Sequence, residues 1–363
     1  MKKLLIITGP MNQGGAETFL MKMYRTLDKT QYQFDFFVMG GKGFYDDEIL
    51  DLGGQITYAP MKTAGFLKYK KFIKSFFQNN KYNYVYRSLS DSIASLDLHY
   101  AKKYGKAKRV IARSAIANSL NKFGHYIYRP LSFRSSNVKI APSTEAAIFM
   151  FGKRNVEKGR VNILMNGIQT SLFAFDSYTR IQKRKELKIK DDDKLFIHVG
   201  RFSEQKNHKE LADIFREVLT LDDKARLLCI GTGDTKENFV KKCKDLNIFK
   251  NIILLERRTD VNELLMAAEI MLLPSLYEGL PNVVIEAQAT GLPCLVSDTI
   301  TKECDATGLV SFEKLNDPKK WAEESLKILN SNWDLRKENS EKFPMKYDIG
   351  QTVKQFIKIV FED

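Results

Sequence analysis

Two glutamates separated by seven residues form the clearest chemical pattern in the chain. The stretch reads Glu278-Gly279-Leu280-Pro281-Asn282-Val283-Val284-Ile285-Glu286. Because proline suits the start of a helix, we expect Glu278 in a loop and Glu286 inside the helix that follows. The N–H groups of Asn282 and Val283 would point outward at the helix start, where the helix dipole favours an anion. A nucleotide sugar fits this arrangement, with its diphosphate on the helix start, its sugar hydroxyls on Glu278 and its ribose diol on Glu286.

Two cations stand in another loop, which begins with Gly200 and contains Arg201 and Lys206. This loop follows the predicted strand Leu195–Val199, and open α/β sheets bind ligands at the carboxyl ends of their strands. An arginine can grip two oxygens while a lysine acts as a point charge, so Arg201 and Lys206 together could neutralise a diphosphate. The ordinary alternative is that these cations, like an isolated glutamate, are solvated surface charges.

Two further glycine-rich turns follow predicted strands. One contains Gly14 and Gly15 before a predicted helix, and the other contains Gly231 and Gly233. Glycines let a ligand approach the backbone, and a helix start favours anions. The turn with Gly14 and Gly15 is neither a Walker loop nor a Gly-x-Gly-x-x-Gly fingerprint, so a plain tight turn is the alternative for it.

The elements that must position these residues alternate between short apolar strands and helices. Strands are predicted at Lys3–Thr8, Gln33–Met39, Gln55–Ala59, Tyr84–Ser88, Arg109–Ala112, Val138–Ala141, Leu195–Val199, Arg226–Ile230, Asn251–Leu255, Ile270–Leu273 and Cys294–Val296. Helical spacing appears between most of them, for example over Ala16–Leu27, His208–Leu219 and Asn282–Ala289. This alternation predicts doubly wound parallel sheets. Because the pattern restarts once, we expect an α/β protein of two Rossmann-like domains facing a central cleft.

The domain boundary is expected near the turn at Asn166–Ser171. This places an N-terminal domain at 1–165 and a C-terminal domain at 166–345, and helical spacing resumes at the end of the chain.

Composition narrows the class of protein. The 363 residues contain no apolar run long enough for a membrane-spanning helix, and the opening apolar stretch is too short for a signal peptide. The four cysteines form no Cys-x-x-Cys pair, so we expect buried reduced thiols and a cytoplasmic protein. The net charge of +14 is uneven: residues 1–180 hold 28 Lys and Arg against 12 Asp and Glu, and the remainder holds 30 against 32. The basic half therefore predicts an anionic partner.

The motifs together resemble glycosyltransferase family 4, whose members are retaining transferases with the two-domain GT-B fold. Glu278 to Glu286 is similar to the family's Glu-x7-Glu motif. Further matches occur in the family's order at Gly14-Gly15-Ala16-Glu17, Asn166-Gly167-Ile168, Gly200-Arg201, Lys206-Asn207 and Gly291-Leu292-Pro293. The resemblance covers essentially the whole chain and is closest to bacterial transferases of exopolysaccharide and capsule synthesis.

The resemblance implies roles for these residues. Arg201, Lys206 and Glu278 would carry the chemistry, the first two by binding the donor diphosphate and the third by contacting the transferred sugar. The other donor-binding positions would be Gly14, Gly15, Asn166, Gly200, Gly233, Arg257, Arg258, Gly279, Leu280, Asn282, Val283 and Glu286. Among these, the loop around Arg257 and Arg258 would line the pocket for the base of the nucleotide. The last helix, 346–363, would cross back onto the N-terminal domain. No metal or cofactor would be required, because the cations and the helix dipole would stabilise the leaving group.

The sequence departs from the family pattern at the end of the fifth strand. Relatives usually carry histidines there, whereas this chain reads Ile111-Ala112-Arg113-Ser114-Ala115. The hypothesis for Arg113 is that it replaces a histidine as a donor-side contact. Asp191-Asp192-Asp193 could suggest a metal site, but it precedes a strand within a polar linker and is expected to be a solvated turn.

Two segments of the basic half carry apolar residues at helical spacing with cations between them, at 66–77 and 122–134. Such helices can lie in a membrane interface or can face a protein core, and both readings stay open. A lipid-linked oligosaccharide acceptor and an anionic membrane surface on the cytoplasmic side would explain the charge.

The leading hypothesis is transfer of a hexose or N-acetylhexosamine, most simply from a UDP-sugar. The alternatives are a GT-B-fold epimerase acting on the nucleotide sugar, or a weakly catalytic subunit that supports a partner transferase. No nucleic-acid-binding motif accompanies the basic charge.

Overall fold

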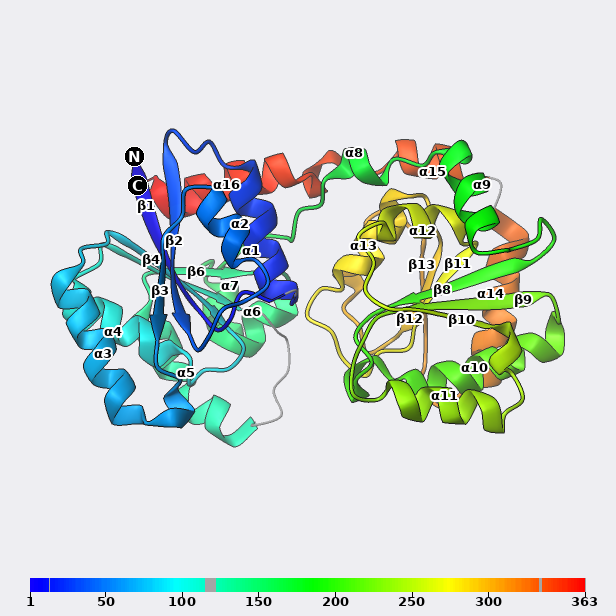
Figure 1. Ribbon diagram of the computed structural model, residues 1–363, viewed down its shortest axis with the longest axis horizontal. Helices are drawn as coiled ribbons and strands as arrows, with labels where there is room; N and C mark the ends of the chain where they lie inside the picture. The colour runs from blue at the N-terminus through cyan, green and yellow to red at the C-terminus, as the bar shows by residue number, and fades with distance from the viewer. Residues whose placement is uncertain (13, 115–121, 333–334, 363) are drawn as a thin grey trace. The chain divides into compact units, whose positions relative to one another are not determined.

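The computed structural model describes residues 1–12, 14–114, 122–332 and 335–362. The chain forms two compact units. The first unit contains Met1–Ile168 together with Lys346–Asp363, and the second contains Gln169–Met345. Each unit is built on one parallel sheet with helices on both faces (Figure 1).

The first unit contains a seven-stranded sheet in the order β3-β2-β1-β4-β5-β6-β7. Its strands are β1 (Lys2–Thr8), β2 (Tyr32–Met39), β3 (Ile56–Ala59), β4 (Tyr84–Leu89), β5 (Arg109–Ser114), β6 (Val138–Ala141) and β7 (Asn162–Ile163). Its helices are α1 (Gly15–Thr26), α2 (Asp46–Asp51), α3 (Phe66–Asn79), α4 (Ser95–Gly105), α5 (Lys122–Ser135), α6 (Thr144–Phe151), α7 (Lys153–Glu157) and α16 (Ile349–Phe361).

The two faces of this sheet bury alternate side chains of the same strands, as the period of a strand requires. On one face, Leu4 and Ile6 of β1 pack with α1, α2 and α16. On the other face, Leu5 and Ile7 pack with α3, α4 and α6. Both faces are covered, which explains why the strands read as nearly continuous apolar runs.

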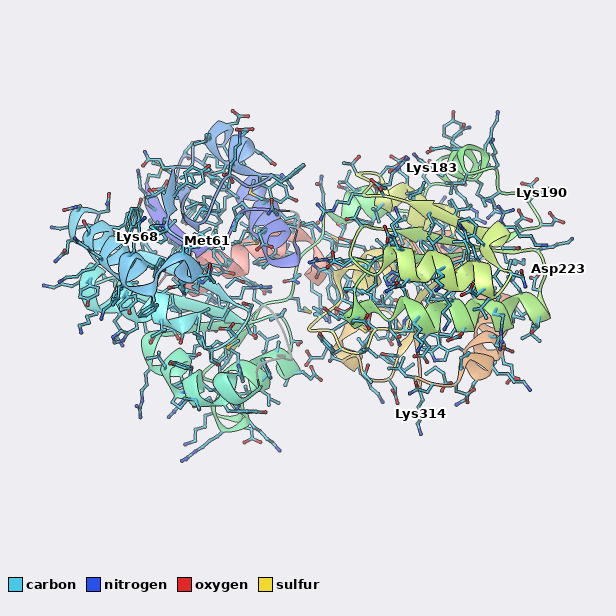
Figure 2. The ribbon with its side chains drawn as sticks, turned by 60° about the horizontal axis from the view of Figure 1, so that its bottom comes forward. Met61, Lys68, Lys183, Lys190, Asp223 and Lys314 are labelled. Atoms are coloured by element: carbon cyan, nitrogen blue, oxygen red, sulfur yellow. The ribbon has the colours of Figure 1, made fainter. Side chains whose placement is uncertain are left out.

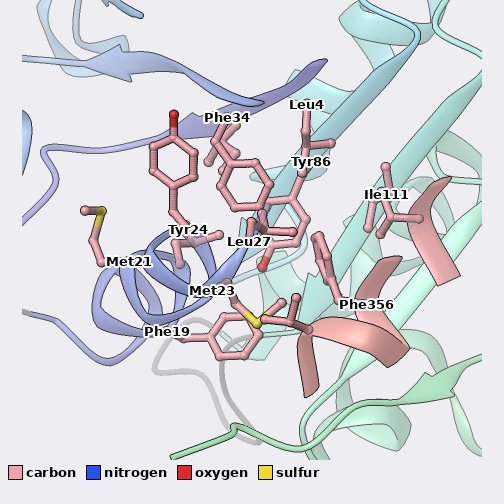
Figure 3. Close-up of a cluster of buried hydrophobic side chains, with 14 of the residues drawn as sticks. Leu4, Phe19, Met21, Met23, Tyr24, Leu27, Phe34, Tyr86, Ile111 and Phe356 are labelled. Atoms are coloured by element: carbon pink, nitrogen blue, oxygen red, sulfur yellow. The ribbon is translucent and has the colours of Figure 1, made fainter. Parts of the chain in front are cut away.

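The C-terminal helix α16 belongs to the core of the first unit. Phe356 is fully buried, and its ring lies 6.2 Å from those of Phe34 and Tyr86 (Figure 3). The chain end is also held through polar contacts, because Lys2 Nζ donates a hydrogen bond of 3.0 Å to the carbonyl oxygen of Phe361. The last helix therefore completes the layer of helices on one face of the first unit's sheet.

The second unit contains a six-stranded parallel sheet in the order β10-β9-β8-β11-β12-β13. Its strands are β8 (Lys194–Val199), β9 (Ala225–Ile230), β10 (Ile252–Leu255), β11 (Ile270–Leu273), β12 (Cys294–Ser297) and β13 (Val310–Glu313). Its helices are α8 (Thr170–Phe173), α9 (Ser177–Glu186), α10 (His208–Leu221), α11 (Lys236–Asp245), α12 (Val261–Ala267), α13 (Asn282–Ala289), α14 (Pro318–Asn332) and α15 (Arg336–Glu341). The helices α10, α11 and α14 cover one face, and α9, α12 and α13 lie on the other (Figure 1).

All eleven predicted strands are present with ends shifted by at most two residues, while the two edge strands β7 and β13 were not predicted. The side chains of β7 are both exposed, so this strand carries no apolar pattern. It pairs with β6 through the backbone and through Asn162, whose Nδ2 donates a hydrogen bond of 3.1 Å to the carbonyl oxygen of Lys139.

No helix among the described residues is long and apolar enough to cross a membrane. All four cysteines are buried thiols.

Replacement of Phe356 by alanine should lower the free energy of unfolding of the first unit by about 3–5 kcal/mol, because a buried phenyl group is lost and a cavity remains. Lys354 is exposed on the same helix, so Lys354→Ala is the matched control. Urea unfolding followed by circular dichroism measures both variants. Equal free energies for the two variants would contradict the packing of α16 described above.

Candidate functional site

The second unit has its topological switch point between β8 and β11. From β8 the chain continues outward to β9 and β10, then returns to place β11 on the other side of β8. Loops after two such strands diverge and leave a crevice at the carboxyl edge, where open α/β sheets bind ligands. The loop after β8 carries Arg201 and Lys206, and the loop after β11 carries Glu278.

Lys206 and Glu278 meet at this switch point. Lys206 Nζ lies 2.6 Å from Glu278 Oε1, and the two side chains are only 15% and 10% exposed. Gln205 supports the pair, since its Nε2 donates to the carbonyl oxygen of Tyr277 at 2.9 Å and to Glu278 Oε2 at 3.3 Å. Sequence reasoning missed Gln205, because no spacing distinguishes this amide from its neighbours in the loop.

Glycines bring the loops after β8 and β9 into contact. Gly231 and Gly233 have φ angles of +154° and +152°. A Cβ atom on Gly231 would overlap the carbonyl oxygen of Gly200, and one on Gly233 would overlap that of Phe202. These positions therefore require glycine for a steric reason within the second unit. Gly200 also lies against Lys206, whose Cε would be 3.0 Å from a Cβ atom placed there.

Arg201 lies at the surface. Its side chain is 69% exposed and contacts Asp234 at 3.4 Å, while the Asp234 side chain is 90% exposed. Exposed ion pairs of this kind contribute little to stability. The guanidinium is consequently available to an anionic ligand at low cost.

Helix α13 begins at Asn282, directly after the loop that carries Glu278. Pro281 is the capping residue rather than a residue of the first turn, and its side chain makes no capping hydrogen bond. Asn282, Val283 and Glu286 are all half-buried, and Glu286 lies inside the helix as predicted. Gly279 is half-buried and Leu280 is buried in the same loop.

The predicted base-binding arginines differ in their surroundings. Arg257 is exposed after β10. Arg258 donates to Asp260 at 2.7 and 2.8 Å and to Glu186 at 2.9 Å, and these hydrogen bonds raise its pKa. Its guanidinium thus links the segment after β10 to α9, so a contact with a base would compete with these carboxylates.

In the first unit, the glycine-rich turn lies beside the switch point between β1 and β4. Gly14 caps α1 and Gly15 is its first residue. The carboxylate of Glu17 folds back over Gly14, where it would overlap a Cβ atom. Burial raises the pKa of Glu17, although the nearby charge of Arg87 opposes this effect.

Arg113 ends β5 as a buried cation, only 2% exposed. Its guanidinium carbon lies 4.0 Å from the centre of the Phe19 ring, and Nη2 donates to Asn166 Oδ1. Burial lowers the pKa of Arg113. The side chain therefore joins β5 to α1 and to the segment at Asn166, and its role as a donor contact stays a prediction. Ala115, the other changed family position, lies outside the described residues.

The triplet Asp191-Asp192-Asp193 lies immediately before β8. Asp192 forms an ion pair of 2.6 Å with Lys224, and Asp193 Oδ2 accepts a hydrogen bond from the N–H of Lys190.

Comparison with known proteins places this geometry among sugar-transferring enzymes. The family model of glycosyl transferases group 1 matches residues 179–343, nearly the whole second unit. The protein named "Putative glycosyltransferase EpsF" of Bacillus subtilis (strain 168) is 31% identical over 331 residues, covering 89% of this chain and 86% of EpsF. The UDP-Gal:alpha-D-GlcNAc-diphosphoundecaprenol alpha-1,3-galactosyltransferase of Escherichia coli is 32% identical over 155 residues, covering 41% of this chain and 39% of that protein.

Among solved structures, the Anabaena protein Alr3699/HepE in complex with UDP has a TM-score of 0.79 at 14% identity and covers 99% of both chains. The likeness confirms the predicted fold class: two Rossmann-like, doubly wound parallel-sheet domains of the GT-B type.

The glycine at 233 provides a test of how closely the loops approach. Gly233→Ala should destabilise the second unit by at least about 2–3 kcal/mol, since both φ and the Phe202 carbonyl oppose a side chain. Gly308 is the control because its φ is +81° while a Cβ atom there would meet open space. Gly308→Ala should cost about 1 kcal/mol. Urea unfolding followed by the fluorescence of Trp321 measures both; a cost at Gly233 no larger than at Gly308 would refute the steric explanation.

Proposed function

The chain belongs to the glycosyl transferases of group 1, and from that premise we propose that it transfers a sugar from a UDP-sugar to a lipid-linked oligosaccharide during synthesis of a surface polysaccharide. The observation that carries the proposal is the Lys206–Glu278 pair at the switch point, directly before the start of α13. It places a cation, a carboxylate and a helix N-terminus at one edge of the sheet.

On the donor side, the diphosphate would lie against Lys206, Arg201 and the first amides of α13. The lysine and the helix dipole favour the charge that develops on the leaving phosphate. Glu278 is already held by Lys206 and Gln205, so its free lone pairs can accept hydrogen bonds from the sugar hydroxyls without reorganisation. Glu286, four residues after the first residue of α13, would accept hydrogen bonds from the ribose diol.

The proposed reaction breaks the bond between the anomeric carbon and the phosphate oxygen, and that oxygen keeps the electron pair. An acceptor hydroxyl forms the new bond to the anomeric carbon, and its proton goes to the departing phosphate. We propose that the configuration is retained and that the two cations take the place of a metal ion.

The relatives supply independent support. HepE was crystallised with UDP and with UDP-glucose, which favours a UDP-sugar donor here. The Escherichia coli relative is named for a diphosphoundecaprenol-linked acceptor, which favours a lipid-linked one. Both the epimerase and the non-catalytic alternative are disfavoured, because the relatives carry transferase names.

Exposed apolar side chains near cations in the first unit support contact with a membrane, both at the start of α3 and on α5, where Tyr126, Ile127 and Tyr128 are 57%, 58% and 37% exposed. Helix α3 turns Tyr69, Ile73 and Phe77 into the core, so its main apolar face is internal. Three apolar side chains remain outside at its start, the α3 tip, with exposed fractions of 50%, 45% and 79% for Met61, Phe66 and Leu67. Exposed lysines follow on the helix at Lys68, Lys70, Lys71 and Lys74. Figure 2 labels Met61 and Lys68, which mark this end of the helix. Apolar groups beside cations suit the headgroup region of an anionic bilayer.

Replacement of Lys206 by alanine should weaken UDP binding by about tenfold or more, because a charge-assisted contact contributes about 1.5–3 kcal/mol. Isothermal titration calorimetry with UDP measures the change, after a thermal-shift panel of nucleotide sugars has identified the donor. Lys250→Ala is the control, since Lys250 is an exposed lysine of the same unit. Unchanged UDP affinity in Lys206→Ala would refute the donor site.

Turnover measurements with the identified donor, together with analysis of the product, test the remaining donor-side proposals. Turnover should survive EDTA, and the product should keep the anomeric configuration of the donor. Loss of activity that manganese restores would refute the metal-free proposal. If Arg113→Ala leaves both turnover and donor affinity unchanged, Arg113 has no part in the donor site.

The α3 tip should bind anionic membranes. Flotation with vesicles of phosphatidylglycerol and phosphatidylcholine should recover the wild-type chain, and recovery should fall several-fold for Phe66→Gln/Leu67→Gln. Leu50→Gln, at another exposed leucine of the first unit (54%), is the control. Equal recovery with purely zwitterionic vesicles would contradict the contribution of the lysines.

A further inference from the structure

A separate pocket of about 250 Å³ opens in the second unit between α10 and α11. It is lined by Ser203, Glu204, Asn207, His208, Lys209, Thr235, Asn238, Phe239 and Lys242. The two helices lie side by side on one face of the sheet in both views (Figures 1 and 2). None of the residues assigned above to the donor lines this space.

The N-termini of both helices reach the pocket. Asn207 is the capping residue of α10 and Thr235 that of α11, and neither side chain caps its helix. The helices contain 14 and 10 residues, so each carries a developed dipole with its positive end at this pocket. Amide N–H groups at such ends bind anions.

His208 gives an independent indication of a missing partner. The side chain is 3% exposed and lines the pocket, yet both ring nitrogens lack a hydrogen-bond partner. The buried hydroxyl of Thr235, also in the lining, lacks one as well. Since buried polar groups are nearly always hydrogen-bonded, these two donors indicate a ligand or water in the pocket.

The ring of His208 is fixed by its neighbours. It stacks on Phe202 at 4.0 Å and meets His198 edge-on at 4.6 Å. Burial, reinforced by the charge of Lys206, lowers the pKa of His208 to about 4. At neutral pH the imidazole is therefore uncharged and offers one N–H donor.

The charges of the lining favour an anion. Lys209 and Lys242 contribute two ammonium groups, and Glu204 contributes one exposed carboxylate. Lys242 also pairs with Asp213, which leaves its remaining N–H bonds able to donate. The other lining groups, apart from Phe239, are hydroxyls, amides and the neutral imidazole.

We propose that this pocket binds a phosphate group, either free or as the monoester of a small metabolite, at a second site distinct from the donor diphosphate. Three features converge on it: two helix N-termini, two ammonium groups and unpartnered buried donors. The loop that carries Lys206 toward Glu278 also supplies Ser203 and Asn207 to the pocket. A bound phosphate would thus contact the segment that positions the donor cation.

Histidine NMR tests the site on the full chain. The chain has only four histidines, at 99, 125, 198 and 208, so their imidazole signals can be assigned by single replacements, including His208→Gln. Titration with inorganic phosphate at constant ionic strength should shift the His208 signal saturably, without shifting those of His99 and His125. No saturable shift at millimolar phosphate would overturn the proposal.

Two lysine variants distinguish binding of phosphate at this pocket from a general attraction to the protein's positive charge. Lys209→Gln should weaken phosphate binding about tenfold, as expected for loss of one charge-assisted contact. Lys241→Gln removes the same charge from an exposed position of α11 outside the lining and should leave phosphate affinity unchanged. Equal weakening by both variants would reduce the effect to bulk electrostatics and overturn the site.

Two further measurements identify the source of the phosphate and distinguish this pocket from the proposed donor site. Tighter binding of a hexose 1-phosphate than of inorganic phosphate supports a metabolite, and the reverse supports the free ion. Lys206→Ala should impair UDP binding but leave the phosphate shift at His208. If Lys206→Ala abolishes that shift, the phosphate occupies the donor site and the second site is refuted, whereas the proposed transferase function stands.

Discussion

The ion pair between Lys206 and Glu278 is the interaction on which the second unit's site depends. It joins the loops after β8 and β11, the two neighbouring strands between which the strand order of the sheet reverses. Both charges are largely removed from water, so neither would be stable there without the other. Gln205 holds the same carboxylate and the backbone beside it, which fixes the loop ahead of α13. The helix N-terminus and the cation consequently keep a constant separation.

The sequence predicts the elements of this site because each rests on a local rule. Apolar runs of four to six residues define the strands, and Pro281 with its apolar neighbours defines the start of α13. The position of Glu286 inside that helix follows from spacing alone. The predicted strand ends match the structure where both faces of the strand are buried, as in β6 and β11, because every residue of these strands is buried.

The remaining features depend on strand order, which a local pattern does not contain. Lys206 and Glu278 are 72 positions apart, and their contact needs β11 to lie next to β8. The carboxylates that hold Arg258 are likewise set by the packing of α9 against α12. The burial of Arg113 also cannot be predicted from the local sequence, because an arginine at a strand end normally reaches solvent. Its enclosure by Phe19 and Asn166 arises only once α1 and the segment after β7 are in place.

Charged side chains act over two different distances in this chain. Residues 169–345 contribute little net charge, so Lys206 of the proposed donor site acts through its position: its partly buried pair with Glu278 is screened weakly by salt. The basic excess within residues 1–180 is carried largely by exposed lysines, such as those of α3, whose attraction to an anionic surface extends over about 10 Å and fades as salt increases. The proposed contact of a nucleotide with Lys206 is therefore expected to depend less on ionic strength than the proposed attachment of the first unit to a charged surface. This difference follows from burial, since the Lys206 side chain is only 15% exposed whereas the lysines of α3 lie at the surface.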